Sequence, residues 1–245
     1  MLPDSSNRTL TASQIRQTGR LMAPLWHTAM VLFVVMGASL GGARGIHPAA
    51  GHHKLRQYLW TMGWEWLLTG FVYLGVRKRT SLRELIGGRW NDVEAFLKDV
   101  IVAAGFWLVS MTVLGAGAKL MHLDAGGKID SLRLQLGVLV PSTTLELLVW
   151  CCLSITAGIC EEIIFRGYLQ RQFGIMARST LAGVIASAIV FGAAHGYEGS
   201  QRMLLIGIFG LLFGLLAWWR KSLRPGMIAH AWHDGLSGAL LRLLK

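Results

Sequence analysis

The amino-acid sequence predicts an all-α protein, a polytopic transmembrane helical bundle of about seven spans. Hydrophobic residues make up 53% of the chain and charged residues only 15%, against about 25% charged residues in an average globular protein. The apolar residues also occur in runs of about 20 without full charges, the length that crosses a hydrocarbon core about 30 Å thick. A soluble domain of this composition would lack the polar surface to cover itself, so we exclude that class.

The predicted spans follow one another after a polar N-terminal segment, residues 1–20. A charged loop at 77–98 is expected to hold a short surface helix, and a second loop is expected to dip into the membrane interface at Leu132–Val140. The sequence shows no internal repeat, so we predict a single membrane-embedded domain over residues 21–245. The predicted spans cover residues 22–43, 57–76, 99–119, 143–168, 179–196, 201–219 and 225–242.

The basic residues lie mainly between the apolar runs. A net charge of +11 would suggest nucleic-acid binding in a soluble protein, but here no basic surface is separable from the loops, so we expect no nucleic-acid partner. Most of the basic residues, including the dense cluster at 77–98, fall on the same side of the membrane as the N-terminus. Because cytoplasmic loops carry an excess of Lys and Arg, we predict a cytoplasmic N-terminus.

The acidic residues at membrane depth are few. They are Glu65, Glu146, Glu161, Glu162 and Asp234. A charged group at the bilayer centre costs about 2.5–3.5 kcal/mol even on the mildest scale, so each requires a partner or a function. Glu65 and Glu146 are assigned no role beyond pairing within the bundle, whereas the adjacent pair Glu161 and Glu162 roughly doubles the cost at one place and indicates a functional site.

Residues Glu161 to Arg166 have a pattern that separates the two glutamates. Glu162 and Arg166 are four residues apart, so on a helix they lie on one face and can form an ion pair within the span. Glu161 lies about 100° away around the helix and has no cation at helical spacing. We therefore predict that Glu162 is structurally compensated and that Glu161 is available as a general base.

Later spans supply histidines at matching depth. Phe191 and His195 lie one turn apart on the fifth predicted span, and His230 and Asp234 lie one turn apart on the seventh. Asp234 could bond the His230 imidazole or stand beside it as a second ligand of the site. His233 could join that face or point elsewhere. Three spans thus each contribute a polar cluster, and in a bundle these clusters can converge on one cavity.

The three patterns EExxxR (Glu161–Arg166), FxxxH (Phe191–His195) and HxxxD (His230–Asp234) resemble, in this order, the type II CAAX prenyl endopeptidase or CPBP family, which is related to the bacterial "abortive infection" membrane proteins. The motifs fall within about residues 145–240, and the first 140 residues share with the family only their apolar spans. The resemblance implies an intramembrane endopeptidase that hydrolyses a membrane-associated peptide or protein. It also favours an integral protein of the bacterial cytoplasmic (inner) membrane.

The resemblance also implies roles for individual residues. Glu161 would activate water together with His195, and His230 with Asp234 would polarise the scissile carbonyl and stabilise the oxyanion. The residues expected to support this site are Glu162, Arg166 and Phe191.

The metal dependence of this chemistry is left open by the sequence. One glutamate and two histidines, here Glu161, His195 and His230, could hold zinc with one position open to water. A glutamate–histidine pair could also activate water without a metal, and both interpretations remain.

Other classes of membrane protein are considered on their residues. No histidine is followed by glutamate, which excludes an HExxH zinc site, and Asp234 alone cannot form an aspartyl pair. Gly235–Gly238 matches a GxSG motif, but no histidine follows it. The alternatives are a proton- or cation-coupled transporter that uses Glu161, Glu162 and Asp234, although inverted repeats are not visible, and a catalytically silent immunity or scaffold member of the same family.

Further features are interpreted as structural. Gly210 and Gly214 form a small-xxx-small face for close helix packing, and Trp218 with Trp219 is typical of an interfacial anchor. His27, like the other scattered histidines outside the motifs, is interpreted as a solvent or interface residue.

Overall fold

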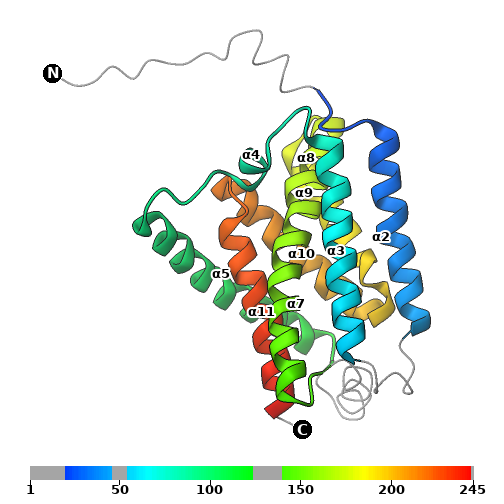
Figure 1. Cartoon of the computed structure of the whole chain (residues 1–245), viewed down its shortest axis with the longest axis vertical. Coiled ribbons are helices and arrows are strands. Elements are labelled where there is room, and N and C mark those ends of the chain that lie inside the picture. Colours follow the sequence, from blue (N-terminus) through cyan, green and yellow to red (C-terminus); the bar gives the residue numbers. More distant parts are fainter. Residues whose placement is uncertain (1–19, 46–53, 124–139, 244–245) are drawn as a thin grey trace, which may run out of the picture.

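The computed structural model describes residues 20–45, 54–123 and 140–243, and within these ranges the chain is helical and contains no strand. Figure 1 shows the helices as one bundle. The predicted all-α bundle is therefore confirmed. The elements are α2 (Leu25–Gly45), α3 (Lys54–Val76), α4 (Leu82–Ile86), α5 (Val93–Leu120), α7 (Thr144–Glu161), the π-helix η2 (Glu162–Leu169), α8 (Gln170–Ala177), α9 (Thr180–Ala194), the 3₁₀ turn η3 (Gly196–Glu198), α10 (Ser200–Arg220) and α11 (Arg224–Leu243).

Each predicted span overlaps a helix of the structure. Among the described residues, three helical stretches are both long and apolar enough to cross a membrane: Val93–Leu120, Thr144–Ala177 and Ser200–Arg220. Helices α2 and α9 are apolar but shorter in their apolar part. Helix α3 carries Glu65 among its apolar residues, and α11 carries His230, His233 and Asp234, which lowers the mean hydropathy of both helices. The number of spans therefore remains a prediction.

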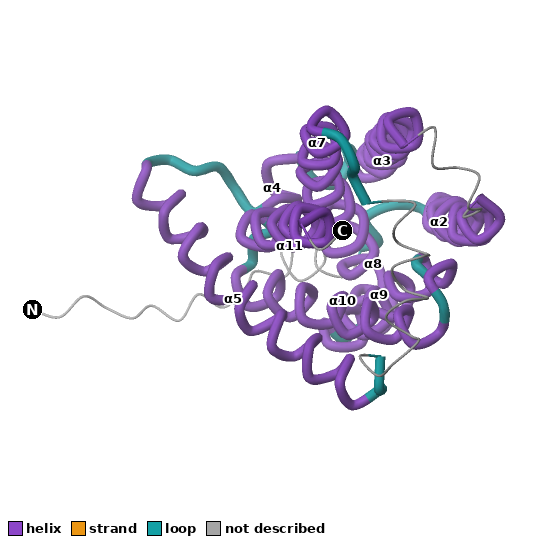
Figure 2. The backbone as a smooth tube through the Cα atoms, turned by 90° about the horizontal axis from the view of Figure 1, so that it is seen from below, coloured by secondary structure: helices purple, strands orange, loops and turns teal. Residues whose placement is uncertain are grey.

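The packing of the bundle places α7 and α11 side by side. Helix α7 also packs against α3, α9 packs against both α8 and α10, and α5 packs against α11 and α10. Figure 2, which looks along the bundle, shows α5 leaning across one outer side while α2 and α3 cover the other. The polar motifs lie on α7, η2, α9 and α11, so they belong to the inner helices of this arrangement.

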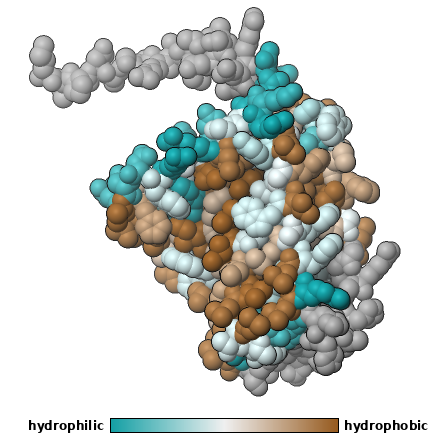
Figure 3. All heavy atoms as spheres, viewed as in Figure 1, coloured by the Kyte–Doolittle hydropathy of each residue, from teal (hydrophilic) through white to brown (hydrophobic). Residues whose placement is uncertain are grey.

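The sides of the bundle expose large hydrophobic residues. Phe33 is 79% exposed, Trp60 74% and Ile101 70%. Figure 3 shows hydrophobic residues over the flank, whereas hydrophilic residues gather at the end where α4 lies. An exposed apolar belt of this extent indicates contact with lipid, because soluble monomers expose only small apolar patches. The chain is therefore an integral membrane protein.

The predicted surface helix in the loop 77–98 is α4. Ser81 caps it, since its side chain accepts a hydrogen bond from the Glu84 amide while the Glu84 carboxylate accepts from the Ser81 amide. The hydrogen bonds that the Glu84 carboxylate accepts, first of all from the Ser81 amide and also from Thr80, hold the pKa of Glu84 below its usual range. The segment expected to dip into the interface, Leu132–Val140, lies outside the described residues except for Val140. The predicted polar segment 1–20 likewise lies outside them except for Arg20.

His27 is not a solvent residue, and that interpretation is wrong. Its side chain is buried, its Nδ1 lies 3.1 Å from the Tyr168 hydroxyl, and its Nε2 lies 3.0 Å from the carbonyl oxygen of Phe71. Gln172 adds to this polar cluster by accepting a hydrogen bond from the Met22 amide and donating to Thr28. Residues far apart in sequence thus satisfy one another and attach α2 to the η2–α8 segment.

The small-residue face of α10 is a packing surface, as predicted. A Cβ atom on Gly210 would lie 3.3 Å from the Ala188 Cα, and one on Gly214 would lie 3.0 Å from a Val184 methyl group. Both neighbours belong to α9. The glycines therefore let the backbones of α9 and α10 approach closely.

Candidate active site

The two adjacent glutamates lie where α7 changes into a π-helix. Glu161 is the last residue of α7 and Glu162 is the first residue of η2, within one continuous helical stretch, Thr144–Ala177. A π-helix widens the turn and redirects the side chains around it, and such segments are common at functional sites. Sequence spacing predicts only a regular helix here, so the π-helix is a feature that the structure adds.

Glu162 is held by two partners. Its Oε1 atom lies 2.9 Å from Nη1 of Arg166 and 3.0 Å from Nδ1 of His230. The side chains of Glu162 and Arg166 are almost completely buried. The predicted ion pair between these residues is therefore present, and it also ties η2 to α11 through His230.

Aromatic rings surround the Arg166 guanidinium. Its central carbon lies 4.4 Å from the centre of the Phe191 ring and 5.4 Å from the centre of the Phe213 ring. The ring of Phe191 also lies 4.9 Å from that of His195 and 6.3 Å from that of His230. Phe191 therefore packs between the cation and both histidines, a position consistent with the supporting role expected from the sequence.

The second nitrogen of His230 faces two carboxylates. Its Nε2 lies 3.6 Å from Glu161 Oε2 and 3.6 Å from Asp234 Oδ2. Both distances exceed that of a hydrogen bond. The Nδ1 contact with Glu162 thus fixes the ring, while Nε2 remains available to bind an oxygen atom of a substrate or of water.

A cavity of about 630 Å³ brings the predicted catalytic residues together. Glu161, His195, His230 and Asp234 all line it, from α7, the end of α9 and α11. Glu162 and Arg166 do not line it but lie buried behind His230. Of the two glutamates, the one predicted to be available as a base, Glu161, lines the cavity, and the one predicted to be paired, Glu162, does not.

The orientation of His195 follows from one hydrogen bond. Its Nδ1 lies 2.9 Å from the main-chain carbonyl oxygen of Phe191. A carbonyl oxygen can only accept, so Nδ1 carries the proton and donates it. In the neutral ring Nε2 then has a free lone pair, which can accept a proton from water.

His233 is positioned by Asp234. Its Nδ1 lies 3.1 Å from Asp234 Oδ1, and both residues line the cavity. The main-chain carbonyl oxygen of Asp234 accepts a hydrogen bond from the Trp150 indole at 2.9 Å. The sequence did not decide whether His233 joins the face of His230 and Asp234. In the structure all three residues line the same cavity.

Further polar residues line the same cavity and were not assigned to it from the sequence, among them Glu65, Tyr197, Glu198 and Arg202. Glu65 lies on α3, outside the three motifs, and Tyr197 lies in the η3 turn after His195. Burial, and next the neighbouring Glu198 carboxylate, to which the hydroxyl donates a hydrogen bond, raises the pKa of the Tyr197 hydroxyl above its usual range, so this group keeps its proton. The sequence feature that could have indicated Tyr197 is its position two residues after His195 of the FxxxH motif.

The described residues do not contain a group of three or more His, Cys, Asp or Glu side chains arranged to hold a metal ion. Of the residues predicted as metal ligands, Glu161 Oε2 and His230 Nε2 lie 3.6 Å apart, a separation that two ligands of one zinc ion can have, and Glu162 holds Nδ1 of His230 as the outer partner of a metal-bound imidazole does. The zinc site therefore stays a prediction, and we derive no step through a metal.

Gly158 allows α7 to lie against α11 next to the glutamates. A Cβ atom on this residue would lie 2.7 Å from the main-chain oxygen of Met227 and 2.9 Å from the main-chain nitrogen of Ala231. Both distances are too short for a real Cβ contact, so only glycine permits this crossing. The close approach brings Glu161 and Glu162 to His230.

We expect the Gly158→Ala protein to be less stable by about 1–3 kcal/mol, because the added methyl group must push α11 away. Its activity should also fall, since the two glutamates and His230 would separate. Thermal unfolding and substrate cleavage measure the two effects. Gly105→Ala is the control, because a Cβ atom there meets nothing within 4 Å. Equal stability of the two variants would contradict the close-packing argument.

Comparison with known proteins identifies one family. The model of the Rce1-like family, "Type II CAAX prenyl endopeptidase Rce1-like", matches residues 143–236. This range contains the EExxxR, FxxxH and HxxxD patterns and the helices that line the cavity from α7 to α11. No curated protein and no solved structure matches the chain. The family resemblance inferred from the three motifs is therefore confirmed.

Proposed function

We propose that this protein hydrolyses peptide bonds of a membrane-associated peptide or protein, with a water molecule activated by Glu161 and His195. Residues 143–236 match the model of the Rce1-like type II CAAX prenyl endopeptidase family, which supports this proposal. The observation that carries the proposal is the convergence of Glu161, His195, His230 and Asp234 on one cavity in an apolar bundle.

The first chemical step needs a proton acceptor and an attacking water molecule. Glu161 has no cation within hydrogen-bonding distance of its carboxylate among the described residues, and His195 presents an unprotonated Nε2. Either group can accept a proton as the water oxygen bonds to the scissile carbonyl carbon. We assign the proton acceptance to Glu161 and the orientation of the water to His195.

The second requirement is stabilisation of the negative charge that develops on the carbonyl oxygen. Because Nδ1 of His230 donates to Glu162, Nε2 can donate to the oxyanion only when the ring is a protonated imidazolium, and we assign that form to His230 in this step. Among the described residues this nitrogen has no hydrogen-bond partner, so it is free for the substrate oxygen. Donors that are fixed before the reaction stabilise an oxyanion strongly in a water-poor site. Collapse of the tetrahedral intermediate then breaks the C–N bond, and the proton held by Glu161 passes to the departing amine.

Glu162 and Arg166 have a positioning role in this proposal. Glu162 holds the His230 ring through Nδ1, and Arg166 neutralises Glu162 while packing on Phe191. The orientation of His230 Nε2 toward the cavity therefore depends on a buried ion pair that does not itself touch the substrate.

The metal question has a direct test. We expect cleavage by the purified protein to persist after treatment with EDTA and with 1,10-phenanthroline, because water activation is assigned to side chains alone. Loss of activity on chelation, restored by added zinc but not by magnesium, would replace this proposal by a zinc mechanism that uses Glu161, His195 and His230.

The proposed activity is tested by comparing membrane proteomes from cells that contain the wild-type protein with those that contain Glu161→Gln protein at the same level. We expect polypeptides trimmed at the C-terminus or internally with the wild-type protein and their full-length forms with the variant. Identical proteomes would favour the catalytically silent immunity or scaffold alternative. Proton or cation uptake by proteoliposomes that depends on Glu161, without any cleavage, would favour the transporter.

A further inference from the structure

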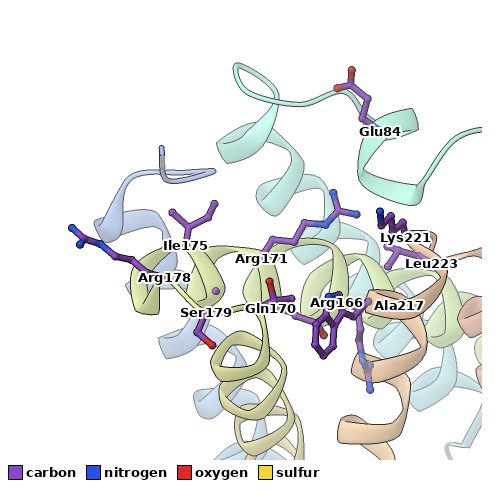
Figure 4. A pocket seen from close by; sticks show the side chains of 13 residues that line it. Glu84, Arg166, Gln170, Arg171, Ile175, Arg178, Ser179, Ala217, Lys221 and Leu223 are labelled. Carbon is purple, nitrogen blue, oxygen red and sulfur yellow. The ribbon is translucent and has the colours of Figure 1, made fainter. Parts of the chain in front are cut away.

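A second cavity opens at the end of the bundle where α4 lies, separate from the candidate active site. Its volume is about 750 Å³, and it lies between α8, the start of α9, the end of α10 and α4 (Figure 4). This is the hydrophilic end of the molecule in Figure 3. The basic-residue distribution predicts that this end faces the cytoplasm.

The lining of this cavity is strongly basic. Among the described residues that line it, Arg166, Arg171, Arg178 and Lys221 are cationic and Glu84 alone is acidic. Arg166 is already paired with Glu162, and the Glu84 carboxylate accepts hydrogen bonds from Ser81 and Thr80. The remaining three cations therefore leave the cavity with an uncompensated positive charge.

The cationic groups are placed for a shared anion. Figure 4 shows the side chains of Arg171 and Lys221 pointing toward one another below Glu84, while Arg178 points outward at the rim. Arg171 donates one N–H group to the Leu85 carbonyl oxygen at 2.9 Å, which holds its side chain against α4. Lys221 and Arg178 have no ion-pair or side-chain hydrogen-bond partner among the described residues. Arg171 and Lys221 repel each other because no acidic side chain of the described residues lies between them. An anion bound between them would relieve this repulsion.

The start of α9 adds polar donors on the other side. Ser179 and Thr180 line the cavity, and the Ser179 hydroxyl accepts from the Ala182 amide. The first two amides of the helix, those of Thr180 and Leu181, have no intrahelical acceptor. The N-terminus of this 15-residue helix therefore reinforces the attraction that the side chains exert on an anion.

Part of the lining is apolar. Ile175, Ala217, Trp218 and Leu223 line the cavity beside the charged groups. Trp219, next to Trp218, is 70% exposed, and paired tryptophans at a helix end are typical of the headgroup region of a membrane. A soluble phosphate would contact only the charged part, whereas a phospholipid would present its phosphate to the cations and its glycerol region to the apolar part.

We propose that this cavity binds the phosphate-bearing headgroup of an anionic phospholipid of the phosphatidylglycerol type, with the phosphate between Arg171 and Lys221 and the acyl chains directed past Trp218 into the membrane. The site is distinct from the catalytic cavity, because no residue lines both, although Arg166, which pairs with Glu162, reaches the lining of this second cavity. Each basic residue near a membrane surface contributes about 1 kcal/mol to the attraction of anionic lipid.

The test is native mass spectrometry of the full-length protein in neutral detergent, with dioleoylphosphatidylglycerol or dioleoylphosphatidylcholine titrated in. We expect saturable binding of phosphatidylglycerol and much weaker binding of phosphatidylcholine. Lys221→Asn should weaken phosphatidylglycerol binding about fivefold, and Lys221→Asn with Arg178→Asn about 30-fold, since each basic residue contributes similarly. Both positions have left-handed backbone conformations, with φ of 51° and 52°, which asparagine tolerates.

The matched control is Arg77→Asn with Lys78→Asn, which removes two charges from the same end of the bundle but outside this cavity. This variant should bind phosphatidylglycerol as the wild type does. Equal loss in both double variants would show a general surface effect and overturn the proposal. Saturation of the wild-type site by inorganic phosphate or glycerophosphoglycerol, with displacement of the lipid, would assign the cavity to a soluble phosphate instead. Equal binding of the two lipids by wild-type protein would also overturn it, without the need for any variant.

Discussion

Glu161→Gln protein is expected to cleave its substrate about 10²–10⁴-fold more slowly than the wild type, because glutamine cannot accept the proton of the attacking water. The protein should still insert and fold normally. Glu161 accepts no hydrogen bond from a described residue, and its side chain is partly exposed to the cavity. The measurement is the rate of product formation at saturating substrate, together with thermal unfolding of the two proteins.

The matched control for this variant is Glu65→Gln, which makes the same change in the same cavity from a different helix. This protein should retain most of its activity. Full activity of Glu161→Gln would refute the role of Glu161 as a base. If Glu65→Gln instead lost activity while Glu161→Gln kept it, the general base would be Glu65 and not Glu161.

Glu162→Gln is expected to destabilise the protein by about 3–5 kcal/mol, the usual cost of removing one partner of a buried ion pair. The loss would leave the guanidinium of Arg166 buried without a counter-charge and would weaken the bond that orients His230. We expect a lower yield and a lower unfolding temperature, and also a loss of activity in the protein that remains folded. Thermal unfolding in detergent measures the first effect.

Glu94→Gln provides the comparison, because Glu94 forms the same i,i+4 type of pair with Lys98 on the exposed surface. An exposed pair contributes about 0–1 kcal/mol, so this variant should unfold close to the wild-type temperature. Glu162→Gln with Arg166→Met removes both charges and should recover part of the lost stability. Equal unfolding temperatures of Glu162→Gln and Glu94→Gln would show that the buried pair is not structural.

The positions of the helices are largely readable from the sequence. Long apolar runs must form helices in lipid, because each main-chain N–H and C=O group needs a partner within its own segment. Each predicted span therefore overlaps a helix, and their order along the chain is as predicted. What the runs do not reveal is their local geometry, such as the π-helix that begins at Glu162.

Only part of the candidate site can be predicted from the sequence. The spacing of Glu162 and Arg166 predicts their ion pair, since it depends on a local periodicity of one helix. The contact between His230 and Glu162 joins residues 68 positions apart. The spacing of His230 and Asp234 suggests a bond between them, but the structure places Nε2 3.6 Å from Asp234 and turns Nδ1 to Glu162 instead.

The surroundings of other polar residues are set in the same way. Asp99 is buried and pairs with Arg220 and Arg224 from α10 and α11. His27 was expected at the surface, yet it is enclosed by Phe71 and Tyr168. Neither has a partner within one helical turn, so local periodicity gives no indication of its environment.

By itself the sequence determined that this protein is a helical membrane bundle with three polar motifs on three helices, because hydropathy and helical spacing act within single segments. The tertiary structure alone decided which polar groups meet: the close crossing of α7 and α11 at Gly158 brings His230 to both glutamates, and the ends of α8 and α10 bring basic residues to one cavity. The physical reason is that a hydrogen bond or ion pair depends on distances of a few ångströms between helices, and these distances are set by packing of the whole bundle.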